Sequence, residues 1–149
     1  MSSLNKNNNN NTNINIVNNK LNSTNFDPSV SSKHFCDFYY SSIQNDGFVN
    51  VSDLFSVSVN CNYNGNNVGG FHNFVIKIAS EGVSKFNYDK INAHTSVLSP
   101  DTLLVTVTGI LSGVTFWGTS TNVTTFSETF ILQYKENDIK INNHIFTIL

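Results

Sequence analysis

At 149 residues and a net charge of −2, the chain can hold one domain with a single core. All eight basic residues are lysines scattered along the sequence, so no basic stripe is available for direct binding of nucleic acid. No apolar run approaches the roughly 20 residues needed to cross a bilayer. The N-terminus lacks the charged-then-apolar order of a signal peptide. We therefore expect an intracellular protein that binds neither nucleic acid nor a membrane.

The N-terminal part is dominated by asparagine and shows no periodic apolar face. Such a polar, low-complexity composition cannot bury enough surface to offset the entropy of ordering. We predict a disordered tail over residues 1–31 and one folded domain over 32–149. Cys36 and Cys61 fall on a predicted helix and a predicted strand without the spacing of a zinc site. Neither a metal nor another cofactor is therefore expected.

Helical periodicity of the apolar residues predicts a first helix over 32–43, with Ser31 or Ser32 as its N-cap. Asn45-Asp46-Gly47 is expected to end this helix. The next predicted elements are a short helix over 52–55 with Ser52 as its N-cap, a half-buried strand over 56–63, a tight turn at Asn64-Gly65 and a helix over 71–80.

The second half of the domain alternates apolar and polar residues with the period of β-strands. Strands are predicted over 86–97, 102–111, 124–134 and 139–149, with turns at Ser99-Pro100-Asp101 and Asn137-Asp138. The segment 112–123 is rich in glycine and threonine and is predicted to be a hairpin loop. The pattern leaves open whether Trp117 in this loop is exposed or folds back onto the sheet. Helices followed by long antiparallel strands predict an α+β domain.

The order and spacing of several short motifs resemble the nuclear transport factor 2 family over residues 32–149. The matching motifs are Phe35-x-x-Phe38-Tyr39-Tyr40, Tyr63-Asn64-Gly65-x-x-Val68-x-Gly70, Val105-x-Val107-x-Gly109-Ile110-Leu111, Phe126-x-x-Thr129-Phe130-Ile131-Leu132 and Asn143-His144-Ile145-Phe146. The resemblance implies a cone-shaped fold in which a curved antiparallel sheet packs on helices. It also implies a non-enzymatic role in nucleocytoplasmic transport.

Differences among subfamilies narrow this expectation. The turn over 63–70 is most similar to the small subunit of the heterodimeric mRNA export receptor. This likeness implies a larger export receptor subunit or a second copy as partner, and a location in the nucleus, the cytoplasm and the nuclear pore. A homodimeric importer of Ran-GDP is an alternative, but the acids expected to hold Ran are missing at 112–118 and at Asn64. A peptide-binding scaffold is a further alternative, since Asp89-x-Ile91-x-Ala93-His94 resembles the stress-granule scaffolds.

Two sets of binding residues follow from the resemblance. Tyr63 and Phe146 match the family positions that bind Phe-Gly repeats of nucleoporins, where a partner phenylalanine would sit between aromatic side chains. Phe126, Glu128 and Phe130 are expected on the broad sheet that forms the dimer interface.

A small-molecule cone enzyme is the remaining alternative, because related cones house isomerases and dehydratases. Such enzymes need a carboxylate or a histidine inside the apolar cone. The candidates on or beside predicted strands are Asp89, Glu128, Asp138 and His94. Glu128 is the most interesting, because it shares its alternation face with two phenylalanines, yet we expect it to be satisfied across a dimer interface. We therefore assign no catalytic residue and expect a protein that is not an enzyme.

Overall fold

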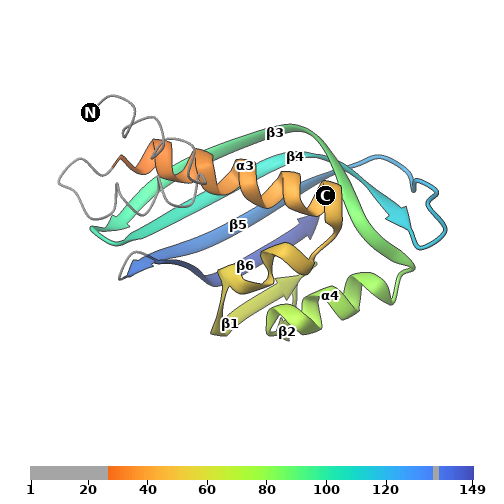
Figure 1. The fold of residues 1–149 in the computed structure, drawn as a ribbon, viewed down its shortest axis with the longest axis horizontal. Coiled ribbons are helices and arrows are strands. Elements are labelled where there is room, and N and C mark those ends of the chain that lie inside the picture. Colours follow the sequence, from red (N-terminus) through yellow and green to blue (C-terminus); the bar gives the residue numbers. More distant parts are fainter. Residues whose placement is uncertain (1–26, 136–137) are drawn as a thin grey trace, which may run out of the picture.

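The computed structural model describes residues 27–135 and 138–149. Its elements are α3 (Pro28–Asp46), the 3-10 helix η1 (Val49–Leu54), β1 (Phe55–Tyr63), β2 (Asn66–Gly69), α4 (Phe71–Ala79), β3 (Val83–Ser99), β4 (Thr102–Thr115), β5 (Thr124–Lys135) and β6 (Asp138–Ile148). The strands form one sheet in the order β2-β1-β6-β5-β4-β3. The sheet curves, and α3 lies across its hollow face, while α4 packs beside β1 (Figure 1). The predicted α+β cone is confirmed.

One strand makes the sheet mixed instead of fully antiparallel. β1 runs parallel to β6, whereas every other neighbouring pair is antiparallel. A parallel neighbour needs a long connection, and here the chain passes through α4 and three long strands before it returns beside β1. This arrangement places the end of the chain in the middle of the sheet.

The first helix begins earlier than the sequence pattern indicated. Asp27 is its N-cap, and its side chain accepts a hydrogen bond of 2.9 Å from the backbone N–H of Ser29. Pro28 occupies the first helical turn, where its missing N–H costs nothing. Ser31 and Ser32, the predicted caps, are instead buried inside the helix. Most of the predicted tail 1–31 lies outside the described residues.

The predicted short helix over 52–55 is also shifted. It is a 3-10 helix over Val49–Leu54, and the hydroxyl of Ser52 donates back to the carbonyl of Val49 instead of capping a start. The strand that follows is confirmed at Phe55–Tyr63, and the next helix at Phe71–Ala79.

The core lies between α3 and the hollow face of the sheet, and aromatic rings fill much of it. The ring of Phe130 meets Phe35 at 5.0 Å and Tyr39 at 4.9 Å, both edge to face. Such geometry is favourable for aromatic pairs beyond their buried area.

The four long strands were predicted, but β3 and β4 extend past their predicted ends and form a longer hairpin.

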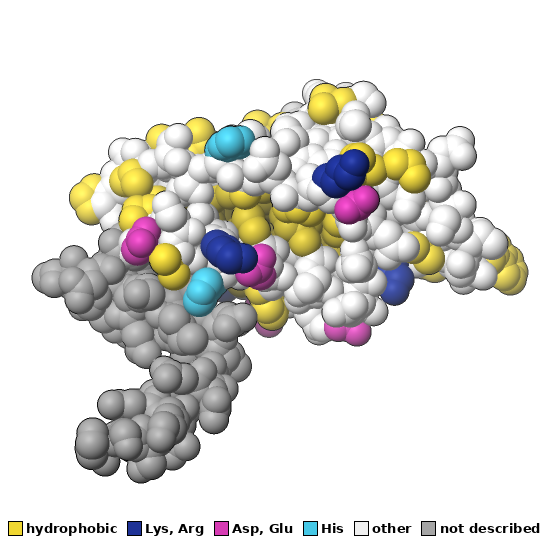
Figure 2. All heavy atoms as spheres, turned by 90° about the horizontal axis from the view of Figure 1, so that it is seen from above, with side chains coloured by type: hydrophobic (Ala, Val, Ile, Leu, Met, Phe, Trp, Pro, Cys, Tyr) yellow, Lys and Arg dark blue, Asp and Glu magenta, His cyan; other side chains and the backbone are white. Residues whose placement is uncertain are grey.

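The loop between β4 and β5 carries exposed aromatic residues. Trp117 is 92% exposed and Phe116 is 64% exposed, which answers the question that the sequence left open for Trp117. Figure 2 shows hydrophobic side chains at the end of the molecule where this loop lies, and few, scattered charged side chains on that face.

Of the predicted turn Asn137-Asp138, Asn137 lies outside the described residues. No helix in the described ranges combines the length and the apolar character that crossing a membrane requires.

Candidate functional site

A carboxylate and an imidazole meet inside the core. Glu128 on β5 and His144 on β6 are 2% and 0% exposed, and Oε2 of the glutamate lies 2.6 Å from Nε2 of the histidine. The register of the two strands explains the contact, because His144 lies opposite Phe130, next along the same face from Glu128. A buried carboxylate of this kind needs partners for its charge.

Two tyrosines of α3 supply further partners. The hydroxyl of Tyr40 donates to Oε1 of Glu128 at 2.8 Å, and the hydroxyl of Tyr39 donates to Oε2 at 3.4 Å. Burial, and secondly the charge of Glu128, raises the pKa of both phenols well above the ordinary value. The tyrosines therefore stay protonated and act as donors, so the carboxylate is the acceptor of the cluster.

The histidine is left with one free ring nitrogen. Because Glu128 accepts, Nε2 of His144 carries the hydrogen that it donates, and in the neutral ring the lone pair lies on Nδ1. Nδ1 is buried and has no hydrogen-bond partner among the described residues. The ring is surrounded by phenylalanines, with Phe74 at 4.7 Å, Phe130 at 5.2 Å and Phe55 at 5.4 Å between centroids. The imidazole of His144 is thus a base that is held in one orientation and surrounded by apolar side chains.

Access to this base is closed by aromatic side chains. Three hollows described at the surface have volumes of about 780, 410 and 390 Å³, and neither Glu128 nor His144 lines any of them. The largest reaches Phe55, whose ring contacts the ring of His144. Within the described ranges, no group of three or more His, Cys, Asp or Glu side chains could hold a metal ion.

The residues expected at the dimer interface point into the core and not toward the outer face of the sheet. Phe126, Glu128 and Phe130 are at most 2% exposed, and all three face α3 inside the cone. Alternation along β5 placed them on one face of the sheet, but it could not say which face was covered. The outward positions of β5 are instead Thr125, Ser127, Thr129, Ile131 and Gln133.

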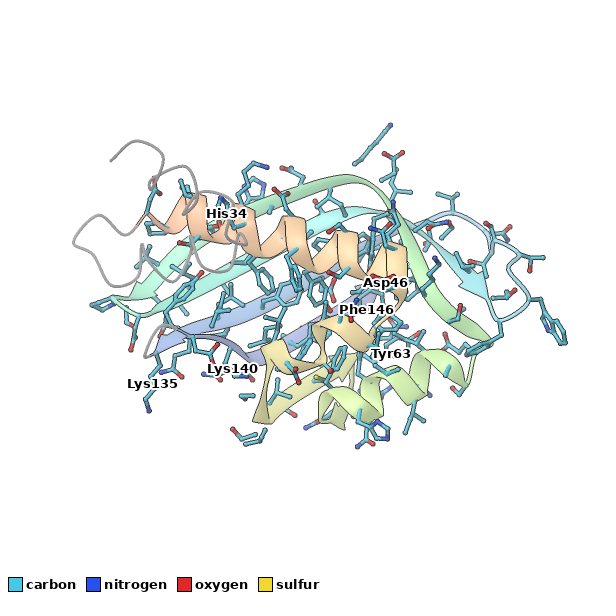
Figure 3. The ribbon with its side chains drawn as sticks, in the orientation of Figure 1. His34, Asp46, Tyr63, Lys135, Lys140 and Phe146 are labelled. Carbon is cyan, nitrogen blue, oxygen red and sulfur yellow. The ribbon has the colours of Figure 1, made fainter. Side chains whose placement is uncertain are left out.

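The two aromatics expected to bind Phe-Gly repeats are also internal. Tyr63 and Phe146 are 4% and 1% exposed, and their rings stack at 5.6 Å. Figure 3 shows both between the end of α3 and α4. The Tyr63 hydroxyl donates to Glu81 at 2.7 Å. In this chain the pair forms part of the core and not an open groove.

The remaining acid–base candidates are not brought together. Asp89 and His94 are exposed on β3, and Asp138 is exposed at the start of β6. His144 was named in the sequence only as part of the motif Asn143-His144-Ile145-Phe146 and was not among the acid–base candidates. A usable signal was present, since Glu128 lies two residues from both Phe126 and Phe130 and His144 lies two residues from Phe146, and a polar residue in such a stripe indicates an inward side chain.

Comparison with known proteins places the fold. No family model and no curated protein matches the sequence. Among solved structures, nuclear transport factor 2 from Cryptosporidium parvum is similar with 20% identity and a TM-score of 0.59, over 78% of this chain and 90% of that one. A hexachlorocyclohexane dehydrochlorinase from Novosphingobium barchaimii is similar with 9% identity and a TM-score of 0.63, over 80% and 85%. A candidate dehydratase from Streptomyces avermitilis has 14% identity and a TM-score of 0.63, over 82% and 97%.

These neighbours correct one expectation. We expected a protein that is not an enzyme, but enzymes stand beside a transport factor among the structures that share this architecture, so the fold is compatible with catalysis. Identities of this size establish the architecture alone. The chain has the nuclear transport factor 2-like fold.

Proposed function

We propose that the protein is a small-molecule enzyme in which His144 acts as a general base and Glu128 orients it. The observation that carries this proposal is the unpartnered Nδ1 of His144, in a ring whose Nε2 is held by a carboxylate at 2.6 Å. A buried polar atom without a partner costs about 1–3 kcal/mol, and a catalytic role is one of the reasons for which folded proteins retain such an atom.

The chemistry that fits is an elimination from a small substrate. Nδ1 would take a proton from a substrate carbon, and the electrons of that C–H bond would form a double bond as the neighbouring hydroxide or halide leaves with its own bonding pair. Glu128, hydrogen-bonded to Nε2 at 2.6 Å, would lie beside the imidazolium and favour its positive charge. The proton on Nδ1 then passes to the leaving hydroxide to give water, or to solvent when a halide leaves. The names of two structural neighbours, a dehydrochlorinase and a candidate dehydratase, are consistent with this class.

The tyrosines have a supporting part in this proposal. With Tyr39 and Tyr40 on the carboxylate and His144 beside them, Glu128 is held by three hydrogen bonds. A base whose orientation is fixed before the substrate arrives avoids reorganisation during the reaction. Tyr39 and Tyr40 are thus positioning residues.

The test is turnover of a panel of neutral molecules that carry a hydrogen on the carbon next to a hydroxyl or halide. We expect product from the full chain and a loss of about 10²–10⁴-fold in His144→Gln, the range for removal of a general base. His94→Gln is the matched control, because His94 is exposed on β3 and is not among the residues that line the hollow of about 780 Å³. Absence of turnover across the panel, or full activity of the folded His144→Gln protein, would reject the proposal.

We also propose that a second copy covers the outer face of the sheet. The outward positions of β4 from Leu104 to Val114 and of β5 from Thr125 to Gln133 carry no charged side chain. Ile145 on β6 adds a side chain that is 48% exposed. These outward positions of threonine and aliphatic residues lack charges that a copy would have to desolvate, and a two-fold axis would place the same face of both copies together.

The mRNA export role, with a larger receptor subunit and Phe-Gly nucleoporins at the nuclear pore, stays a prediction. Its support is the fold shared with the Cryptosporidium transport factor. Purification of the tagged full chain from its own cells, followed by mass spectrometry, tests it. Recovery of an export receptor with nucleoporins would support this role, and their absence from a preparation that turns over small molecules would reject it.

A further inference from the structure

The largest of the three described hollows lies outside the aromatic side chains that surround His144. It has a volume of about 780 Å³ and is formed by η1, the start of β1, α4, the start of β3 and the β4–β5 loop. This volume falls within the range of about 300–1,000 Å³ for small-molecule sites. The side chains that matter here are Phe55, Ser56, Phe71, Val75 and Phe116.

The lining defines what the hollow can bind. Val57 and Phe116 expose apolar side chains at it, and covering such surface is favourable by about 25 cal/mol per Å². Asp46 is the single Asp, Glu, Lys or Arg among the lining residues, and its carboxylate already accepts from Asn50 at 3.0 Å. An anionic ligand would therefore find no lysine or arginine in the lining, so a neutral ligand is favoured over an anion.

One polar atom of the lining lacks a partner. The hydroxyl oxygen of Ser56 is buried and has no hydrogen-bond partner among the described residues. Ser56 lines this hollow next to Phe55 and also the hollow of about 390 Å³ next to Gln133. A carbonyl or hydroxyl on an otherwise apolar ligand could satisfy this group after a local shift of the surrounding side chains, since buried hydroxyls require a partner.

A single layer of rings separates the hollow from the base. Phe55 and Phe71 both line the hollow and stack on each other at 3.8 Å with 15° between their planes. Phe55 also contacts His144, and Phe71 packs on Phe74, which contacts the same imidazole. Phe55 thus lines the hollow and contacts the imidazole of His144 directly, and Phe71 is stacked on it.

We propose that this hollow is the entrance and recognition site for a neutral, largely apolar substrate with one carbonyl or hydroxyl group, and that Phe55 and Phe71 form the door to His144. The part of this inference that concerns the door rests on the proposed function of His144. Binding in the hollow does not depend on catalysis.

Binding is tested by titrating the full chain with Nile red, a neutral apolar dye that carries a carbonyl group. Val75→Asp places a charge in the lining and should weaken saturable binding at least about tenfold. Ile76→Asp is the matched control, because Ile76 is the next residue of α4, is 51% exposed and does not line the hollow. It should bind as the unchanged chain does. Equal weakening in both variants, or no saturable binding by the unchanged chain, would overturn the proposal.

The door is tested by nuclear magnetic resonance of the His144 ring. In Phe55→Ala the bound dye should reach the imidazole and shift its ring signals, whereas Ile76→Ala, outside the lining of the hollow, should give the response of the unchanged chain. No added shift in a folded Phe55→Ala protein that still binds the dye would reject the door.

Measuring dye binding and turnover in the same variants distinguishes binding in the hollow from catalysis at His144. Glu128→Gln should bind the dye normally and lose turnover. Dye binding without any effect of Glu128→Gln on turnover would reject the catalytic role alone. Turnover that depends on His144 and is unchanged in Val75→Asp would reject the hollow alone.

Discussion

The hydroxyl of Tyr40 lies 2.8 Å from Oε1 of Glu128 and ties the first helix to the fifth strand. The two residues are far apart in the sequence, and both are buried. The contact therefore joins the two layers of the cone through a hydrogen bond to a charged group, which contributes more than one between neutral groups.

Tyr40→Phe removes this hydrogen bond and keeps the ring. We expect the free energy of unfolding to fall by about 1.5–3 kcal/mol, since the lost bond is to a buried charge. Tyr39→Phe is the matched comparison, because its hydroxyl lies 3.4 Å from Oε2 and makes a longer contact. Tyr39→Phe should lower the free energy of unfolding by less than Tyr40→Phe does. Urea unfolding of both variants checks the order, and an equal or reversed order would contradict it.

Glu128→Gln keeps the shape of the side chain but removes its charge. The amide nitrogen cannot accept, so at least one of the donors from Tyr39, Tyr40 and His144 loses its partner. We expect a loss of about 3 kcal/mol in unfolding free energy, as for one broken partner in a buried ionic contact. Glu81→Gln is the control, since its remaining oxygen can still accept from Tyr63. A loss of similar size in both variants would show that the burial of Glu128 does not matter.

Stability should fall in alkaline solution. Burial, the largest cause, raises the pKa of the Cys36 and Cys61 thiols from 9.0 to about 12. Between these values the unfolded chain has released the protons and the native state still holds them. The native state then binds more protons, so stability decreases as pH rises above 9 toward 12. The urea midpoint should be lower near pH 10 than near pH 8.

The cysteine part of this slope can be isolated. A chain with Cys36→Ala and Cys61→Ala should show a weaker decline, with the part due to the buried tyrosines retained. An alkaline decline identical to that of the unchanged chain would mean that the thiols do not contribute.

The proposed dimer predicts different outcomes for a charge placed on the outer face of the sheet and a charge placed on its inner face. Ile145→Asp changes an outward side chain that is 48% exposed and should give a folded monomer. Phe126→Asp buries a charge in the core, where its side chain is 0% exposed, and should prevent folding. Light scattering gives the mass, and circular dichroism reports folding. A monomeric unchanged chain, or an Ile145→Asp dimer, would contradict the interface.

Local patterns determined much of the fold. Alternation identified the four long strands, and helical periodicity with its stop signals identified α3 and α4, because these patterns depend on neighbours within one element. Cap positions were less well determined, since Asp27, Ser31 and Ser32 are all chemically able to cap a helix. The choice among them depends on which residues the sheet buries.

The sequence by itself therefore determined the elements, their order and the α+β class. It also placed Phe126, Glu128 and Phe130 on one face of a strand. Only the tertiary structure decided that this face is the inner one, and that Glu128 meets His144 there. The physical reason is that alternation has two equivalent faces, and the packing of α3 on one of them breaks the equivalence. Contacts between strands likewise depend on register, which no single strand encodes.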